Sequence, residues 1–370
     1  MSVYITSTGH FLPGEPVENE QMEARLGLVN GKPSRLKRRI LQSNGIQTRH
    51  YAMDAEHNTT HSNAEMAARA GDDCLEQAAL RPSQVQLLSA ATSQGDLVLP
   101  GFGSMVQAEL GLRDIELHTS HGICSSSMMA LKAAYTSLKA EEHDNALVVA
   151  SELASRLFKA SRYEAAGGDP DFNAEFLRWM LSDGAGAFLL EKQPRGRCFR
   201  IDWIKGFSHA DAYPVCMTVG QPSDAADQRS WQDFATYAEA EAAGALLLRQ
   251  DVRLLDNIVK LGVDGYLKLI DSGHVRPDQV DHLLCHYSSH YFKSRIFDML
   301  QQAGVGIEEA RWYSNLYTRG NTGCASIMIM LDEFRRTRAH EPGQTILCMV
   351  PESGRFNTVY MQLNVVEGEQ

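Results

Sequence analysis

Cys124 is the residue of this chain best placed to act as a nucleophile. It stands in SHGICSSSMMALKAA, where a glycine-containing turn follows a predicted strand and leads into a predicted helix. Unpaired N–H groups and the helix dipole favour a thiolate there, so we expect a lowered pKa for this thiol. The same N–H groups could donate to the oxyanion that forms when a thiolate attacks a thioester.

Three further polar residues follow predicted strands or turns and could meet Cys124. His286 comes directly after VDHLLC, so we expect its imidazole at the carboxyl end of a strand, where α/β proteins place ligands. Asn321 lies in the turn GNTG, before a second apolar helix. Glu152 follows ALVVAS and could act as a base if burial raises its pKa, although a salt bridge or a helix cap would also explain it.

The elements that must position these residues occur twice along the chain. In both halves a strand leads to the key turn, and an apolar helix and two strands follow, with another apolar strand earlier in the half. The segments are 85–91, 115–118, 128–138, 146–151 and 184–190 in the first half, and 280–285, 311–316, 325–334, 345–350 and 358–363 in the second. The order predicts an α/β protein with duplicated halves, 1–192 and 193–370. Insertions at 156–180 and 217–250 are expected to cover the site.

Composition excludes several other classes of protein. At 370 residues, 44% hydrophobic and 22% charged, the chain exceeds one small domain and has no apolar run of roughly 18 residues, so we expect no membrane span. The N-terminus lacks a secretory signal, which predicts a cytoplasmic protein. Seven widely spaced cysteines without a CxxC pair argue against disulfides and a metal cluster. A net charge of −11 argues against nucleic-acid binding.

Several motifs together resemble β-ketoacyl-acyl carrier protein synthase III and its relatives over nearly the whole chain. They are GIQTRH (45–50), the Cys124 turn, SDGAGA (182–187), His286 after its strand, GNT (320–322) and ESGRF (352–356). The resemblance implies a thiolase fold with five αβαβα layers and no cofactor or metal. It implies that Cys124 carries an acyl group, that His286 and Asn321 stabilise the enolate left when a malonyl-type extender loses carbon dioxide, and that the Cys124 and Gly354 amides form an oxyanion hole.

Two motifs depart from the pattern of that family. CHYSS replaces the family's PHQAN, and His290 stands five residues before Arg295, as the family's catalytic histidine does before its arginine. The strand position favours His286, because His290 is expected in the following helix. GKPSRLKRRIL replaces a tryptophan-containing motif that helps to clamp coenzyme A. This favours thioesters of acyl carrier protein over those of coenzyme A, with Lys37, Arg38 and Arg295 as docking candidates.

Residues 31–52 and SELASR (151–156) are most similar to ketosynthase/cyclases of dialkylresorcinol and bacterial stilbene biosynthesis. That resemblance implies the joining of two β-ketoacyl units, one of them α,β-unsaturated, and a Michael-type closure to a cyclohexane-1,3-dione. Glu152 or His286 would then remove a proton for the closure. An initiating synthase with a linear product, acyl transfer to oxygen or nitrogen, and a noncatalytic partner subunit remain alternatives. The resemblance also implies a homodimer, because thiolase-fold units pair across a shared sheet, and segment 99–102 is similar to one that reaches a neighbour's pocket in that family.

Overall fold

The computed structural model describes residues 1–168, 170–224 and 226–368 of the chain. Its main sheet has ten strands in the order β12-β11-β13-β14-β8-β1-β7-β6-β4-β5. Strand β1 (Tyr4–Phe11) pairs antiparallel with β7 (Gly184–Glu191) on one side and with β8 (Arg197–Ser208) on the other. The junction between the two predicted halves is therefore inside one continuous sheet.

The two halves of the sheet are built alike. In the first, β4 (Leu87–Thr92) is parallel to β5 (Glu116–His121) and to β6 (Asn145–Glu152), which runs antiparallel to β7. The second half has the same pairing: β11 is parallel to β12 and β13, and β13 is antiparallel to β14. Its strands are β11 (His282–Cys285), β12 (Trp312–Tyr313), β13 (Thr345–Glu352) and β14 (Asn357–Glu367). The mixed α/β class predicted from the repeat is confirmed.

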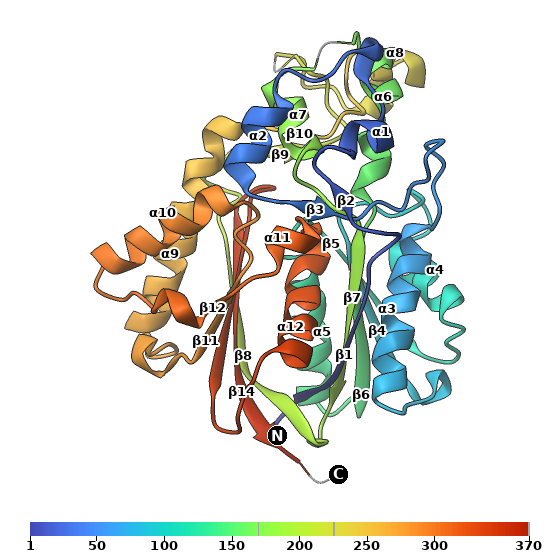
Figure 1. Ribbon diagram of the computed structural model, residues 1–370. Coiled ribbons are helices and arrows are strands. Elements are labelled where there is room, and N and C mark those ends of the chain that lie inside the picture. Colours follow the sequence, from blue (N-terminus) through green and yellow to red (C-terminus); the bar gives the residue numbers. More distant parts are fainter. Residues whose placement is uncertain (169, 225, 369–370) are drawn as a thin grey trace.

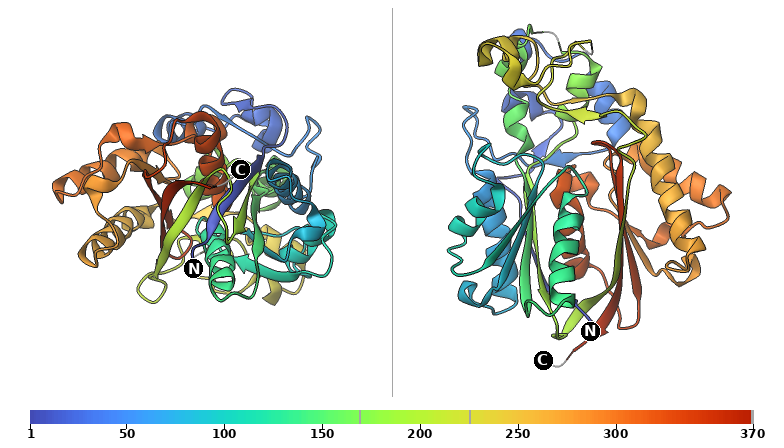
Figure 2. Two further views of the ribbon diagram at one scale, coloured as in Figure 1. Left: turned by 90° about the horizontal axis from the view of Figure 1, so that it is seen from below. Right: turned by 180° about the vertical axis from the view of Figure 1, so that it is seen from behind.

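Helices lie between and outside the two half-sheets (Figures 1 and 2). Helices α5 (Ser126–Lys139) and α12 (Ser326–Thr337) occupy the middle, α3 (Asn63–Gln77) and α4 (Phe102–Glu109) cover the first half, and α9 (Leu255–Asp271) and α10 (His290–Gln302) cover the second. Helix α12 is buried from Ser326 to Phe334, as expected for a helix covered on every side. Among the described residues, no helix is both long and apolar enough to span a bilayer.

Shorter elements form a cap over one end of the sheet, at the top of Figure 1. They are α1 (Met22–Leu26), α2 (Lys37–Asn44), α6 (Ala160–Ala165), α7 (Phe172–Arg178), α8 (Tyr237–Ala242), and the pairs β2 (Val17–Glu18) with β3 (Thr48–Arg49) and β9 (Met217–Thr218) with β10 (Arg249–Gln250). The buried guanidinium of Arg178 donates to the carbonyls of Phe158 and Gly27 at 3.1 and 2.8 Å, which ties the cap to the N-terminal segment.

One predicted strand is mostly wrong. Of residues 311–316, only Trp312 and Tyr313 form β12, and helix α11 (Leu316–Arg319) begins after two intervening residues. Strand β12 lies at the edge of the sheet and pairs with β11 alone, so little backbone pairing is available to extend it.

A cluster of His10, Asp73 and Asp332 has the residue types of a cation site. However, Arg336 lies 2.6 Å from an Asp73 oxygen and 2.8 Å from an Asp332 oxygen, and its guanidinium already balances both carboxylates. The cluster joins β1, α3 and α12, and it has a structural explanation without an ion.

Candidate active site

Cys124 lies in the turn between β5 and α5, as predicted, with 5% of its surface exposed. The following residue holds the turn in place: the Ser125 N–H donates to Glu352 Oε2 at 3.0 Å, and the Ser125 hydroxyl donates to the same oxygen at 2.6 Å. Because Glu352 ends β13, these bonds connect the first-half turn to the second-half sheet. The structure thereby fixes Cys124 against a strand more than 200 residues away in sequence.

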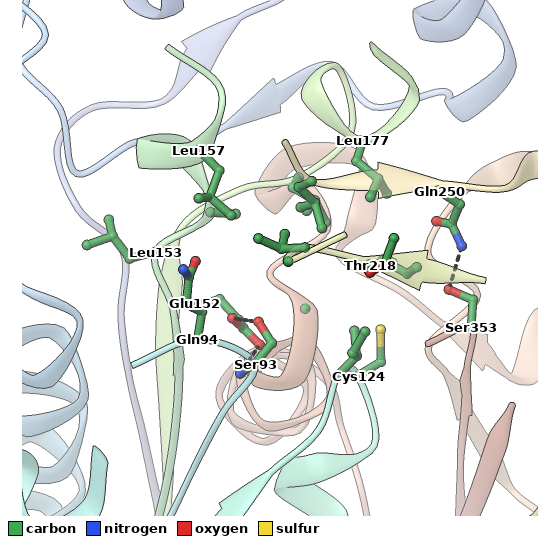
Figure 3. A pocket seen from close by; sticks show the side chains of 18 of the residues that line it. Ser93, Gln94, Cys124, Glu152, Leu153, Leu157, Leu177, Thr218, Gln250 and Ser353 are labelled. Atoms are coloured by element: carbon green, nitrogen blue, oxygen red, sulfur yellow. Dashed lines mark hydrogen bonds between the residues drawn. The ribbon is translucent and has the colours of Figure 1, made fainter. Parts of the chain in front are cut away.

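Cys124, Glu152 and Asn321 line one cavity of about 560 Å³. Figure 3 shows Cys124 and the Glu152–Ser93 pair at the base of this cavity, with Leu157 and Leu177 above them. Both insertions contribute to its walls. The apolar lining includes Val98, Leu153, Leu157, Leu177, Met180, Met217, Val219, Trp231, Leu246 and Leu248. Such a volume with few polar groups is typical of a small-molecule site.

The Glu152 carboxylate is buried and well supplied with donors. Its Oε1 accepts the N–H groups of Ser93 and Cys324, both at 3.2 Å, and its Oε2 accepts the Ser93 hydroxyl at 2.5 Å. Burial raises the pKa of Glu152, and these hydrogen bonds only partly oppose it. Glu152 is not in a salt bridge with any described residue, so the side chain has the environment expected of a buried acid or base.

His286 lines a second, much smaller recess, of about 20 Å³, which Cys124 also lines. The histidine follows β11, and its N–H donates to the Met349 carbonyl at 2.9 Å. His290 begins α10 and packs against the rings of Tyr287 and Tyr317 instead. It is not among the described residues that line either space, so the geometry favours His286 as the partner of Cys124.

Asn321 occupies the turn before the 3-10 helix Gly323–Ala325 and α12, in the position that Cys124 holds before α5. Its Oδ1 accepts the Gly323 N–H at 3.0 Å, which fixes the orientation of the amide. Its backbone is held by a parallel bridge to Leu181. Asn321 is 3% exposed, and it reaches the cavity from the second half while Glu152 reaches it from the first.

The charge state of Cys124 differs from the prediction. Burial raises the pKa of the thiol well above its ordinary value, and the carboxylates of Glu352 and Glu152 raise it further, whereas the thiol's own backbone N–H lowers it only in part. The start of a helix does favour a thiolate, but here desolvation and two anions outweigh it. Burial also lowers the pKa of His286 to about 4, so this imidazole is neutral near pH 7.

Two backbone amides are available for an oxyanion. Within the described part of the chain, the N–H groups of Cys124 and Gly354 donate to no other residue. A Cβ added at position 354 would lie 2.7 Å from the Ile123 side chain, so that side chain would have to shift to admit any other residue. Close packing of this kind brings the Gly354 turn directly against the Cys124 turn.

The predicted docking residues are in different environments. Arg38 is exposed on α2, whereas Lys37 lies 3.1 Å from Glu23 and Arg295 pairs with Asp256. Helix α2 packs beside α10, so all three cations lie on two neighbouring helices. Of these cations, Arg38 is the exposed one.

The sequence reasoning did not identify Glu352 as a residue of the site, nor Ser93 or Gln250. Glu352 had been assigned only to a family motif, and Ser93 and Gln250 carry no motif at all. Gln250 is 1% exposed, lines the cavity and donates to Ser353 Oγ at 3.0 Å. The one feature of the sequence that could have indicated Gln250 is that this polar residue ends the predicted insertion 217–250.

The chain is similar to several known proteins in sequence and in fold. A model of the 3-oxoacyl-[acyl-carrier-protein] synthase III family matches residues 120–205, and a model of the C-terminal part of that family matches residues 270–354. The β-ketoacyl-[acyl-carrier-protein] synthase III of Rhodospirillum rubrum is 27% identical over 93% of each chain. Two solved structures share the fold: AbyA1, a tetronic acid condensing enzyme (TM-score 0.78, 21% identity, 98% and 99% of the chains), and OleA of Xanthomonas campestris (0.76, 18%, 98% and 99%).

Fold, site and both matching family models define this chain as a condensing enzyme, an acyltransferase of the ketosynthase type. More particularly, its sequence and fold are similar to those of 3-oxoacyl-[acyl-carrier-protein] synthase III, and these matches support a Claisen-type condensation.

Proposed function

We propose that the enzyme joins two acyl units through a thioester on Cys124. The observation that carries this proposal is the position of Cys124 where two spaces meet, a large apolar cavity with Glu152 and Asn321 and a small recess with His286. An acyl chain on sulfur fits the apolar cavity, because its burial releases water from both surfaces. The enolate of a second thioester then attacks the carbonyl carbon of this acyl group, which forms the carbon–carbon bond and breaks the bond to Cys124 sulfur.

The donors around Cys124 suit both halves of a condensation. The amides of Cys124 and Gly354 are placed to stabilise the oxyanion of the attacked thioester. The neutral imidazole of His286 and the amide of Asn321 are suited to the enolate oxygen of the second unit, since the pKa of about 4 keeps His286 a neutral donor. Its buried Nε2 has no hydrogen-bond partner among the described residues, which leaves it available to a substrate.

The substrates are proposed to be thioesters of acyl carrier protein or coenzyme A. The names of the related synthases include acyl carrier protein, and the OleA structure contains lauroyl-CoA and lauric acid. Arg38 on α2 is the cation best placed to meet an acidic carrier protein, with Lys37 and Arg295 on the same side.

We further propose that the two units are β-ketoacyl chains and that the product closes to a cyclohexane-1,3-dione, a precursor of dialkylresorcinols or stilbenes. Glu152 supports this step, because a buried carboxyl with a raised pKa in the same cavity can exchange a proton with an acidic carbon. One protein of the same fold is named a tetronic acid condensing enzyme, so a ring-forming member has precedent in the fold. An initiating synthase that releases a linear β-ketoacyl product is the second candidate.

Mass spectrometry tests the proposal in two stages. An acyl-pantetheine thioester should add one acyl mass to the wild type and to Cys324→Ala, but not to Cys124→Ala. Cys324 is the matched control because it is a fully buried thiol in the second-half turn and has no place in the cavity lining. A β-ketoacyl and an α,β-unsaturated thioester are then supplied together. If only linear products form, the ring closure is excluded. If the wild type gains no acyl mass, the acyl-Cys124 mechanism is excluded, and this is the result expected of a noncatalytic subunit.

A homodimer is part of the same proposal. Leu97, Val98 and Leu99 are 52%, 74% and 83% exposed, and Val98 also lines the cavity, so this loop offers an apolar surface beside the site. Sedimentation of the wild type and of Leu99→Ser distinguishes a dimer that uses this loop from a monomer.

A further inference from the structure

The oxyanion-hole amide of Gly354 is physically connected to the wall of the acyl cavity. The Gly354 carbonyl accepts the N–H groups of Cys216 and Met217 at 2.9 and 3.2 Å; Met217 begins strand β9 and Cys216 directly precedes it. The Gly354 carbonyl shares its peptide plane with the Arg355 N–H and is joined to the Gly354 N–H through one Cα, so a shift of β9 displaces the Gly354 turn. This turn therefore depends on the position of a cap strand.

A second bond, visible in Figure 3, reinforces the connection. The Gln250 side chain of β10 donates to Ser353 Oγ at 3.0 Å and lies 3.3 Å from Cys216 Sγ. Gln250 also pairs with Met217 in the β9–β10 ladder. One buried side chain thus links both cap strands to the residue immediately before Gly354.

The same cap strands form part of the cavity. Met217, Thr218 and Gln250 line it, and residues 246 and 248, just before β10, add two leucines to the lining. An acyl chain long enough to reach β9 and β10 would pack against them and hold them in place, whereas a short chain would leave the contact unmade. Occupation of the far end of the cavity and the geometry of Gly354 are thereby coupled through a few bonded residues.

The other side of the Gly354 turn is held independently of the cap. Glu352, two residues earlier, accepts the N–H and the hydroxyl of Ser125. Of the two oxyanion donors, the Cys124 amide is therefore anchored to the sheet, while the Gly354 amide is held from the cap as well. The cap is the part that a substrate chain touches.

We propose that Gln250 is a positioning residue. Through Gln250, a long acyl chain that packs on β9 and β10 fixes the position of the Gly354 N–H in the oxyanion hole. The inference rests on the acyl-Cys124 mechanism proposed above. When the chain packs on β9 and β10, Gln250 and the β9 amides hold Ser353 and Gly354, so that the Gly354 N–H points at the developing oxyanion. Binding energy from the remote end of the chain thus increases the rate of acylation rather than affinity alone.

Single-turnover acylation of Cys124 by a series of acyl-pantetheine thioesters tests the inference. In the wild type we expect the maximal acylation rate to rise with chain length until the cavity is filled. In Gln250→Leu, which cannot donate, and in Ser353→Ala, this rise should be largely lost. Long-chain rates should fall roughly 10- to 100-fold, as expected for a misplaced oxyanion donor. Ser353→Thr keeps the hydroxyl and should restore most of the dependence.

Alkylation of Cys124 by iodoacetamide is the control, because that reaction forms no oxyanion. Its rate should change by less than about threefold in these variants, whereas a general disturbance of the site would slow both reactions. The double variant should resemble either single one, since both remove the same link. An unchanged chain-length dependence in both Gln250→Leu and Ser353→Ala would overturn the inference while leaving acyl-Cys124 intact. If no thioester acylates Cys124 in the wild type, the proposed function fails as well.

Discussion

Replacing His286 should remove a specific part of the acid sensitivity of this protein. In the unfolded chain the imidazole takes up a proton below about pH 6.5, whereas burial lowers its pKa in the folded protein to about 4. The folded state then binds fewer protons between these two values. The contribution of His286 to the free energy of unfolding is therefore complete above about pH 6.5 and is lost as the pH falls toward 4. At roughly 1.4 kcal/mol for each pH unit, the loss between pH 7 and pH 5 is about 2 kcal/mol.

Urea unfolding, followed by far-UV circular dichroism at pH 7 and pH 5, measures this loss. The wild type should lose about 2 kcal/mol more than His286→Asn over that interval. Asn321→Ala is the matched control, because it removes another buried polar group of the site without removing a titrating one, and its loss should equal that of the wild type. If His286→Asn loses as much stability as the wild type, the imidazole is not buried in a neutral form and our account of its role as a neutral donor is wrong.

Three other substitutions give separate checks. Gly354→Ala, whose new Cβ would meet Ile123 at 2.7 Å, should slow thioester acylation of Cys124 roughly 100-fold or more, measured by intact mass, and should change iodoacetamide alkylation much less. Glu152→Gln should raise the melting temperature by roughly 1–4 °C at pH 7. The raised pKa of Glu152 means that its ionised form destabilises the folded protein at this pH, and glutamine carries no charge. An unchanged or lower melting temperature would contradict this reasoning. Arg178→Met should destabilise the fold by roughly 2–4 kcal/mol and expose the cap to limited proteolysis, because three carbonyls lose their donor.

The repeat in the sequence was sufficient to predict the mixed α/β class and the elements beside the turns of Cys124 and Asn321, but not strands β1 and β8, which join the two halves. Both halves carry long apolar strands and a helix with many apolar residues, and such segments have few alternatives to the centre of an α/β structure. The edge strand was less predictable, since the pairing that defines β12 comes from one neighbour only. The hydrophobic pattern of the sequence therefore predicted strands most accurately where both faces of the strand are buried.

The electrostatics of the site could not be predicted from local sequence. The turn around Cys124 correctly indicates a helix start, but the carboxylate that bonds to Ser125 belongs to Glu352, at the far end of the chain. Likewise, Gln250 reaches Ser353 only because the cap folds back over the sheet. Effects of this kind depend on distances between remote segments, which composition and spacing do not contain.

These charges bear on the order of events at Cys124. A thiol with a raised pKa beside an imidazole with a lowered one does not rest as a thiolate–imidazolium pair, because burial penalises both ions. In the mechanism proposed above, the sulfur therefore loses its proton as it attacks the thioester and the proton passes to the departing thiolate, while the charge moves to an oxygen that the Cys124 and Gly354 amides can meet. Once acylated, the sulfur no longer carries a charge near Glu152 and Glu352, so burial favours the acyl-enzyme over the free thiolate. The same environment that makes the resting thiol unreactive therefore protects the intermediate until a second acyl unit arrives.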